Sequence, residues 1–195
     1  VKRAVNELAA EHLVERARGK GTHVIYKYSP KPVKAPMIGV LEEIESIAEN
    51  STATVLECAM IKPPQTIGAE FSLKRGEPLF HLSRTRERGG GVFGYFDSWT
   101  AGIQAPKSSD IFIQESRHKY FRENGMHISH IKQSISAIAA SPIIAKHLNV
   151  EPGAPLLSLV RHSYKQNGDQ EELVDYLLAL YNSELFQYQM DLKLD

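Results

Sequence analysis

The sequence has few of the features that mark membrane, secreted or disulfide-linked proteins. It contains a single cysteine, Cys58, so no disulfide can form within the chain. It has no run of about 18 apolar residues that would span a membrane, and no signal-peptide pattern at its start. Cys58 lies in the apolar run ATVLECAMI, where we expect a buried reduced thiol rather than a nucleophile. These absences predict a cytoplasmic protein.

Motifs for catalysis and cofactor binding are missing as well. The histidines are scattered, no Cys/His spacing suits zinc, and neither a GxSxG elbow nor a phosphate-binding P-loop occurs. Gly89–Gly91 lacks the helix and the lysine that follow the glycines of a P-loop, which predicts a turn. We therefore expect no catalytic residues, no metal and no cofactor.

An excess of charge of one sign is absent overall but present locally. Basic and acidic residues each number 23, so the net charge is zero. The first 34 residues are nevertheless basic, with eight lysines or arginines against three acids. Such an end fits either a polyanionic partner for that end alone or a solvated basic surface, and charge by itself leaves both open.

The first 28 residues predict a helix followed by a hairpin. Apolar residues recur at helical spacing as far as Leu8. After His12 the pattern changes to two short strands at 13–16 and 22–25, joined by the loop RGKG, whose glycines can adopt positive φ.

The rest of the chain predicts a linker and an α+β domain with an antiparallel sheet and short helices. Residues 29–37, SPKPVKAPM, contain three prolines and predict an extended linker. The domain, 38–195, opens with four apolar residues on one helix face: Ile38, Leu41, Ile44 and Ile47. Strands are then predicted at 53–62, 79–88, 92–100, 126–140, 156–166, 172–181 and 185–194, with helices at 111–123 and 141–148.

An internal repeat relates two parts of this domain. Residues 75–91, RGEPLFHLSRTRERGGG, resemble residues 152–168, PGAPLLSLVRHSYKQNG. The matches in register are Gly76 with Gly153, Pro78 with Pro155, Leu79 with Leu156, Leu82 with Leu159, and Arg84 with Arg161. A duplicated helix–strand–strand unit would give a sheet with pseudo-twofold symmetry, and ligand sites often form where two such halves meet.

The start of the chain resembles the end of a GntR-family winged helix-turn-helix domain. The residues that carry this resemblance are Val1, Lys2, Ala4, Val5 and Leu8 in the recognition helix, and Leu13, Val14, Arg16, Gly19, Gly21, Thr22 and Val24 in the wing. His12 departs from the family's usual glycine. The resemblance implies that Lys2 and Arg3 approach the DNA major groove, and that the wing residues Arg18, Gly19, Lys20 and Gly21 reach the backbone or minor groove.

The printed sequence begins inside this helix and holds none of the family's first two helices. A partial helix of about 12 residues is marginal on its own. We therefore expect this chain by itself to bind DNA weakly and with strong salt dependence.

The remainder resembles the UTRA effector domain of the HutC subfamily, whose fold is similar to chorismate lyase. The motifs that carry this resemblance, in order, are PLFHLSRTR, FDSW, SRHKYF, QSISAIAA, NVEPGAPLLSL, LVDYLLALYN and FQYQMDL. The resemblance implies a homodimeric, ligand-responsive bacterial transcription regulator, with most relatives acting as repressors. Its expected partners are operator DNA and a small anionic effector such as a phosphosugar or a carboxylate.

Arg84 and Arg86 are the strongest candidates for holding an anion. They stand two apart on a predicted strand, so both side chains point to one face. Two guanidinium groups on an inward face are costly unless an anion pairs with them, and their geometry suits phosphate or carboxylate. Arg88 continues the same spacing, which favours the alternative of a solvated face with salt bridges.

The resemblance supplies the other candidate ligand residues. Ser116 and His118 match a Ser-x-Tyr at a helix start that helps to bind an anion. Asp175 matches an acid that accepts sugar hydroxyls, and Tyr181 a tyrosine that closes the pocket. Phe96 falls where the symmetry mate of that acid is expected, with Asp97 there if the register shifts slightly, so a plain sugar phosphate is in doubt.

Two other functions stay open at this point. The shared fold allows a chorismate-lyase-like enzyme, although a wing followed by a Pro/Lys linker has no use in a lyase. A dimerisation module without a ligand is the other alternative, and an apolar or absent pocket around Arg84 and Asp175 would support it.

Overall fold

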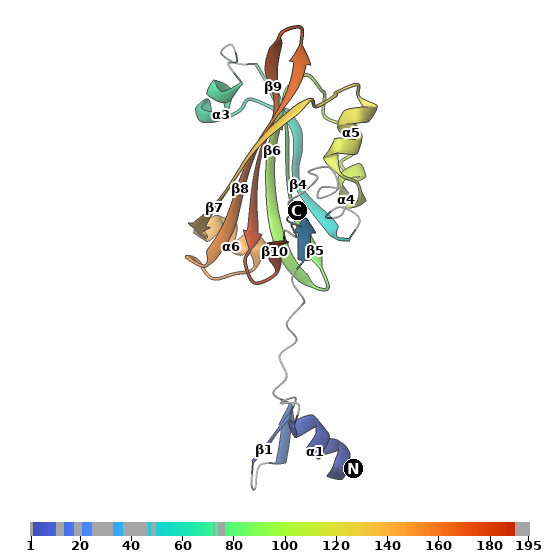
Figure 1. The fold of residues 1–195 in the computed structure, drawn as a ribbon, viewed down its shortest axis with the longest axis vertical. Helices are drawn as coiled ribbons and strands as arrows, with labels where there is room; N and C mark the ends of the chain where they lie inside the picture. The colour runs from blue at the N-terminus through green and yellow to red at the C-terminus, as the bar shows by residue number, and fades with distance from the viewer. Residues whose placement is uncertain are drawn as a thin grey trace, which may run out of the picture. The chain divides into compact units, whose positions relative to one another are not determined.

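The computed structural model describes residues 2–10, 14–17, 21–24, 33–36, 47, 50–71, 73 and 77–189 (Figure 1). The chain divides into two compact units, Val1–Lys31 and Pro32–Asp195, which are treated separately below. None of the described helices is both long enough and apolar enough to cross a membrane. The exact domain and linker boundaries expected from the sequence stay predictions.

The first unit contains the predicted helix and hairpin. Helix α1 spans Lys2–Ala10, and strands β1, Val14–Ala17, and β2, Gly21–Val24, pair in antiparallel fashion. Gly21 begins β2 with a φ of 86° and no atom near the position of a Cβ, so the turn uses a conformation that favours glycine. The wing residues Arg18, Gly19 and Lys20 lie outside the described residues.

The second unit is built on an antiparallel sheet of six strands in the order β4-β5-β6-β9-β8-β7. The strands are β4 Thr52–Ile61, β5 Leu79–Arg88, β6 Gly91–Thr100, β7 His130–Ala139, β8 Pro155–Asn167 and β9 Gln170–Asn182. Each of these was predicted from the sequence to within a few residues. The fold class, an α+β domain with an antiparallel sheet and short helices, is confirmed.

The order of the strands in the sheet reflects the internal repeat of the sequence. The unit β4-α3-β5-β6, with α3 at Gln65–Glu70, corresponds to β7-α6-β8-β9, with α6 at Pro142–Leu148. The two units occupy opposite halves of the sheet and meet where β6 pairs with β9. Both hairpins also carry a bulge at the corresponding place, between Arg86 and Glu87 and between Ser163 and Tyr164.

Short helices cover both faces of this sheet (Figure 1). The predicted helix at 111–123 is two helices, α4 Ile111–Gln114 and α5 Arg117–Glu123, because Glu115 is extended with a ψ of 153°. Phe112 of α4 stacks on Phe80 of β5 with ring centroids 6.0 Å apart. Since Phe80 shares its parity with Arg84 and Arg86 in β5, α4 and α5 cover the face on which these arginines lie.

Helix α6 covers the opposite face, where Ala145 and Leu148 pack with Leu156 and Leu180. Ser141 caps this helix by accepting a hydrogen bond from the Ile144 amide, as the Ser-Pro pair predicted.

A short parallel pair of strands completes the second unit. Strand β3, Val33–Pro36, pairs with β10, Phe186–Gln189, so that Val33 faces Phe186. The proline-containing stretch 29–37 was expected to be extended, but its pairing with the end of the chain was not predicted. Of the expected helix over 38–47, only Ile47 is described, and it is helical and buried.

Candidate functional site

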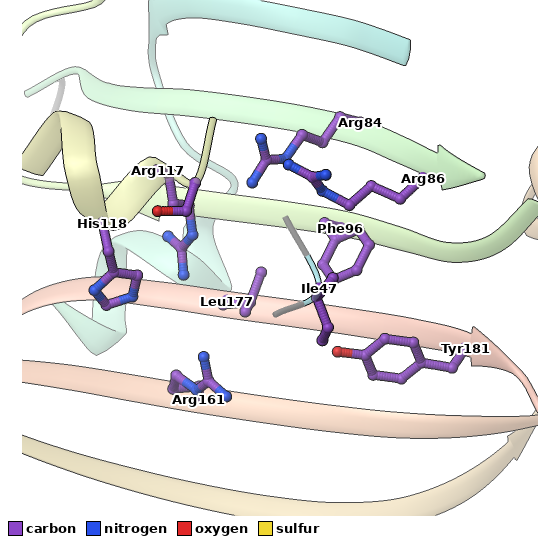
Figure 2. Close-up of a pocket in the computed structure, with 10 residues that line it drawn as sticks. Ile47, Arg84, Arg86, Phe96, Arg117, His118, Arg161, Leu177 and Tyr181 are labelled. Atoms are coloured by element: carbon purple, nitrogen blue, oxygen red, sulfur yellow. The ribbon is translucent and has the colours of Figure 1, made fainter. Parts of the chain in front are cut away.

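A buried pocket lies over the centre of the sheet, where the two halves meet (Figure 2). Its lining comes from β5, β6, β8 and β9, from the start of α5, and from Ile47. The ten lining residues are Ile47, Arg84, Arg86, Phe96, Ser116, Arg117, His118, Arg161, Leu177 and Tyr181. They include four arginines and no acid.

Arg84 and Arg86 both point to this pocket and both are buried, with exposed fractions of 6% and 1%. The shared face predicted from their spacing is therefore present. Arg88 does not continue the series, because it lies at the last position of β5, beside the hairpin turn, where it is exposed. The solvated-face interpretation that Arg88 favoured is wrong for the first two arginines.

Both guanidinium groups donate to the backbone that joins α4 to α5. Arg84 Nη1 donates to the carbonyl oxygens of Phe112, at 3.0 Å, and Glu115, at 3.3 Å. Arg86 Nη2 donates to the same Glu115 oxygen at 3.2 Å, while its Nη1 donates to Ser51 Oγ at 2.9 Å. These partners are neutral, so they satisfy hydrogen bonds without cancelling positive charge.

Arg161 and Arg117 are pocket residues that the candidate set from the sequence did not contain. Arg161 is the repeat equivalent of Arg84, and this equivalence was a signal that could have placed it in the site. Its Nε donates to Gln133 Oε1 at 2.7 Å. Arg117 lies between the two predicted residues Ser116 and His118, and no sequence pattern singled it out.

Asp175 is not among the residues that line the pocket. It is completely buried, forms an ion pair with Arg117 Nη1, and accepts a hydrogen bond from Thr100 Oγ1 at 2.9 Å. Ser163 Oγ donates to its second oxygen at 3.5 Å. With these donors around it, Asp175 acts as the counter-ion of Arg117 in this structure.

The symmetry mate expected for Asp175 was placed two residues away from its true position. Arg84 pairs with Phe96, whereas its equivalent Arg161 pairs with Leu177, so Phe96 corresponds to Leu177. Asp175, two residues before Leu177, therefore corresponds to Gly94. Asp97 points to the other face, where it contacts His81. The motif comparison missed this because the β8–β9 hairpin extends two residues further on each strand than the β5–β6 hairpin.

Phe96 and Tyr181 form an apolar wall of the pocket, with ring centroids 5.5 Å apart in an edge-to-face arrangement. Tyr181 stacks in turn on Phe186 at 3.8 Å. A Cβ at Gly94 would lie 2.8 Å from the Phe96 ring, so the ring takes this position only because residue 94 is glycine.

Ser116 and His118 stand at the start of α5, as predicted. Ser116 Oγ caps the helix by accepting a hydrogen bond from the Lys119 amide at 3.3 Å. His118 is 4% exposed, and its Nε2 has no hydrogen-bond partner among the described residues; the same is true of Arg117 Nη2. Two buried polar atoms without a partner at the edge of one pocket indicate a place where a ligand group would bind.

The electrostatics of the pocket disfavour additional positive charge. Burial, followed by the charges of Arg86 and Arg117, lowers the pKa of Arg84 well below its ordinary value. Burial lowers the pKa of Arg86 to about 10. Burial, Arg117 and Arg161 together lower the pKa of His118 to about 2, so His118 is neutral at physiological pH. A bound anion would raise the pKa of each of these groups, because it favours their charged forms.

The pocket in this state has a cavity volume of about 40 Å³. That is room for a few water molecules and not for a sugar phosphate. A ligand of metabolite size therefore needs side chains or the α4–α5 connection to move.

The DNA-binding candidates fall in the first unit. Lys2 and Arg3 lie in the first turn of α1, and Gly21 opens β2.

Comparison with known proteins gives matches of two kinds, to a family and to individual proteins. A family model described as UTRA domain matches residues 48–187. The HTH-type transcriptional repressor NagR of Bacillus subtilis strain 168 is 25% identical over 171 residues, covering 86% of this chain and 69% of NagR.

Two crystal structures align well with the fold. PhnF from Mycobacterium smegmatis has a TM-score of 0.68 at 18% identity and covers 100% of this chain and 84% of that one. The ligand-binding domain of a GntR-family transcriptional regulator from Bordetella bronchiseptica has a TM-score of 0.62 at 25% identity, covering 74% and 90%.

Proposed function

The chain belongs to the UTRA-domain family, and from this premise we propose that its arginine-lined pocket binds a small anionic effector that controls operator binding. The chain is a ligand-responsive transcription regulator rather than an enzyme: NagR is named as a transcriptional repressor, and the Bordetella bronchiseptica structure is the ligand-binding domain of a GntR-family transcriptional regulator. We further propose that it acts as a repressor, in keeping with the name of NagR, and that it does so as a homodimer.

The main support for an anionic effector is the residue composition of the pocket lining. Four arginines face one buried space, and none of the ten residues around it is acidic. Burying like charges together costs free energy that a bound anion would offset. Arg84 and Arg86 would hold the anion through their planar, forked donors, while Ser116 and His118 line the pocket at the start of α5 and Phe96 and Tyr181 form its apolar wall.

We propose a different task for Asp175 from the one that its family position implied. Since its oxygens already receive Arg117, Thr100 and Ser163, it would position Arg117 rather than accept hydroxyl groups from the effector.

Arg84 and Arg86 both donate to the Glu115 carbonyl oxygen, and this shared contact offers a way for effector binding to change the structure outside the pocket. An anion between Arg84 and Arg86 competes with the carbonyl oxygen that both now contact. Moving that oxygen would move the connection between α4 and α5. In a dimer, this would alter how two DNA-binding units are held and so change operator affinity.

Titration calorimetry with inorganic phosphate tests the proposal directly. We expect binding that Arg84→Gln or Arg86→Gln weakens about tenfold or more, because each removes a charge-assisted contact. Arg88→Gln, an exposed arginine on the same strand, is the matched control and should leave the affinity unchanged.

Melting the same variants without phosphate separates binding from folding. If both pocket variants melt lower while phosphate affinity stays constant, the arginines only stabilise the fold and the chain is a dimerisation module.

Sedimentation of the protein at tens of micromolar should show a dimer, and a monomer would rule out the proposed assembly.

A further inference from the structure

The pocket has two cationic sides that the repeat relates to each other. Arg84 pairs with Phe96 in one half of the sheet, and Arg161 pairs with Leu177 at the equivalent place in the other half. Figure 2 shows Arg84 and Arg86 on one side of the pocket and Arg161 on the other, with Phe96 and Leu177 between them. Three strand spacings, roughly 14 Å, separate the backbones of β5 and β8.

The second side of the pocket, formed by Arg117, His118 and Arg161, has hydrogen-bond donors for a second anionic group. Arg117 Nη2 and His118 Nε2 are buried without hydrogen-bond partners among the described residues, and Arg161 lines the same pocket. Both orphan atoms can donate a hydrogen bond, Arg117 always and His118 in one of its neutral tautomers. A carboxylate or phosphate oxygen would supply the acceptors that these atoms lack.

The middle of the pocket is poor in acceptors for hydroxyl groups. Phe96 and Leu177 occupy the equivalent positions of the two halves, and the buried carboxylate, Asp175, is already surrounded by its own donors. A hydroxyl-rich ligand would leave donors unsatisfied there, which costs more than burying an apolar surface.

We propose that the effector carries two anionic groups joined by a short apolar middle, as in an unsaturated or aromatic diacid. One group binds Arg84 and Arg86, the other binds Arg117, His118 and Arg161, and the middle packs on Phe96 and Leu177. This inference rests on the proposed function, because it presupposes that the pocket binds an anion at all.

Matched pairs of acids test it with the full chain in calorimetric titrations at constant ionic strength. The probes are fumarate against crotonate, muconate against sorbate, and terephthalate against para-toluate. In each pair a methyl group replaces one carboxylate, so the length and the middle are kept. We expect the best-fitting diacid to bind at least tenfold more tightly than its monoacid partner, since it gains a second charge-assisted contact.

Arg161→Gln should reduce the ratio of diacid to monoacid affinity to near one. Lys165 is a half-exposed cation on the same strand, and Lys165→Gln should leave this ratio unchanged. Should Arg161→Gln fail to fold, Arg161→Lys serves instead, because it keeps the charge and loses the planar fork.

The outcomes separate this inference from the function it builds on. If phosphate binds but no diacid exceeds its monoacid partner, the two-ended effector is wrong and the anion-binding regulator stands. The same conclusion follows if glucosamine-6-phosphate binds more tightly than every diacid. If neither phosphate nor any acid binds, both proposals fall.

Discussion

Asp175→Asn is the most informative single change for the energetics of the pocket. The aspartate is completely buried and its side chain pairs with Arg117, which is itself only 6% exposed. The substitution keeps the size of the side chain and the hydrogen bonds to hydroxyls while removing the charge. Arg117 is left as an uncompensated buried cation beside Arg84, whose pKa is already lowered by burial and by its arginine neighbours.

Breaking a buried ion pair by removing one partner costs about 3–5 kcal/mol. For a unit of this size the cost corresponds to a drop in melting temperature of roughly 6–20 °C. Asp97→Asn is the matched control, because Asp97 lies on the neighbouring strand β6, is 24% exposed, and pairs with His81. It should cost less than about 1 kcal/mol.

Urea unfolding at neutral pH measures both variants. The double variant Arg117→Met/Asp175→Leu should recover most of the loss, because it removes the cation together with its partner. Phosphate should also stabilise Asp175→Asn more than it stabilises the unaltered chain, since the cation then lacks its partner. A loss no larger than that of the Asp97 control, or a double variant no more stable than Asp175→Asn, would refute this reasoning.

Three further predictions follow from the pocket and its walls. Because burial and nearby arginines hold the folded pKa of His118 at about 2, against 6.5 when unperturbed, the unfolded chain binds the extra proton first and stability falls as the pH drops below about 6.5. In urea titrations across pH, His118→Gln should flatten this acid loss, whereas exposed His127→Gln should leave its slope unchanged. Gly94→Ala should cost about 1–3 kcal/mol, because the new Cβ would lie 2.8 Å from the Phe96 ring, and phosphate affinity should fall as the ring shifts. Gly68→Ala in α3, where the new Cβ meets only Pro63 at 3.8 Å, should instead stabilise by about 0.5–1 kcal/mol in the same unfolding assay.

The parts of the fold that could be predicted from the sequence are those that local patterns determine. Alternating and continuous apolar runs located all six strands of the sheet, and glycines marked the turn of the β5–β6 hairpin. The repeat predicted two related halves because each match preserved its register, and the sheet order agrees with that symmetry. The shared face of Arg84 and Arg86 followed from their spacing, whereas their burial did not.

The parts that were missed depend on contacts between distant residues. Arg117 and Asp175 are 58 residues apart, and nothing in either segment reveals their pairing. Arg88 shares the spacing of Arg84 and Arg86 but is exposed, because it lies at the end of β5 beside the hairpin turn, and spacing alone does not show which part of a strand is covered. The pairing of β3 with β10 likewise joins segments about 150 positions apart, and proline-rich composition predicts extension without a partner.

That short parallel pair has a mechanical consequence for how tension would enter the second unit. Strand β3 follows directly on the first unit along the chain, while β10 is attached at its own beginning, through residues 183–185, to strand β9. Because the strands are parallel, a pull on the chain before Val33 and the anchor before Phe186 act at the same end of the pair. The hydrogen bonds are then loaded one after another and peel open, instead of sharing the load in shear. The β3–β10 pair is therefore the mechanically weaker part of the unit. A small force would separate β3 from β10 before it disrupted the six-stranded sheet to which Arg84, Arg86 and Arg161 belong.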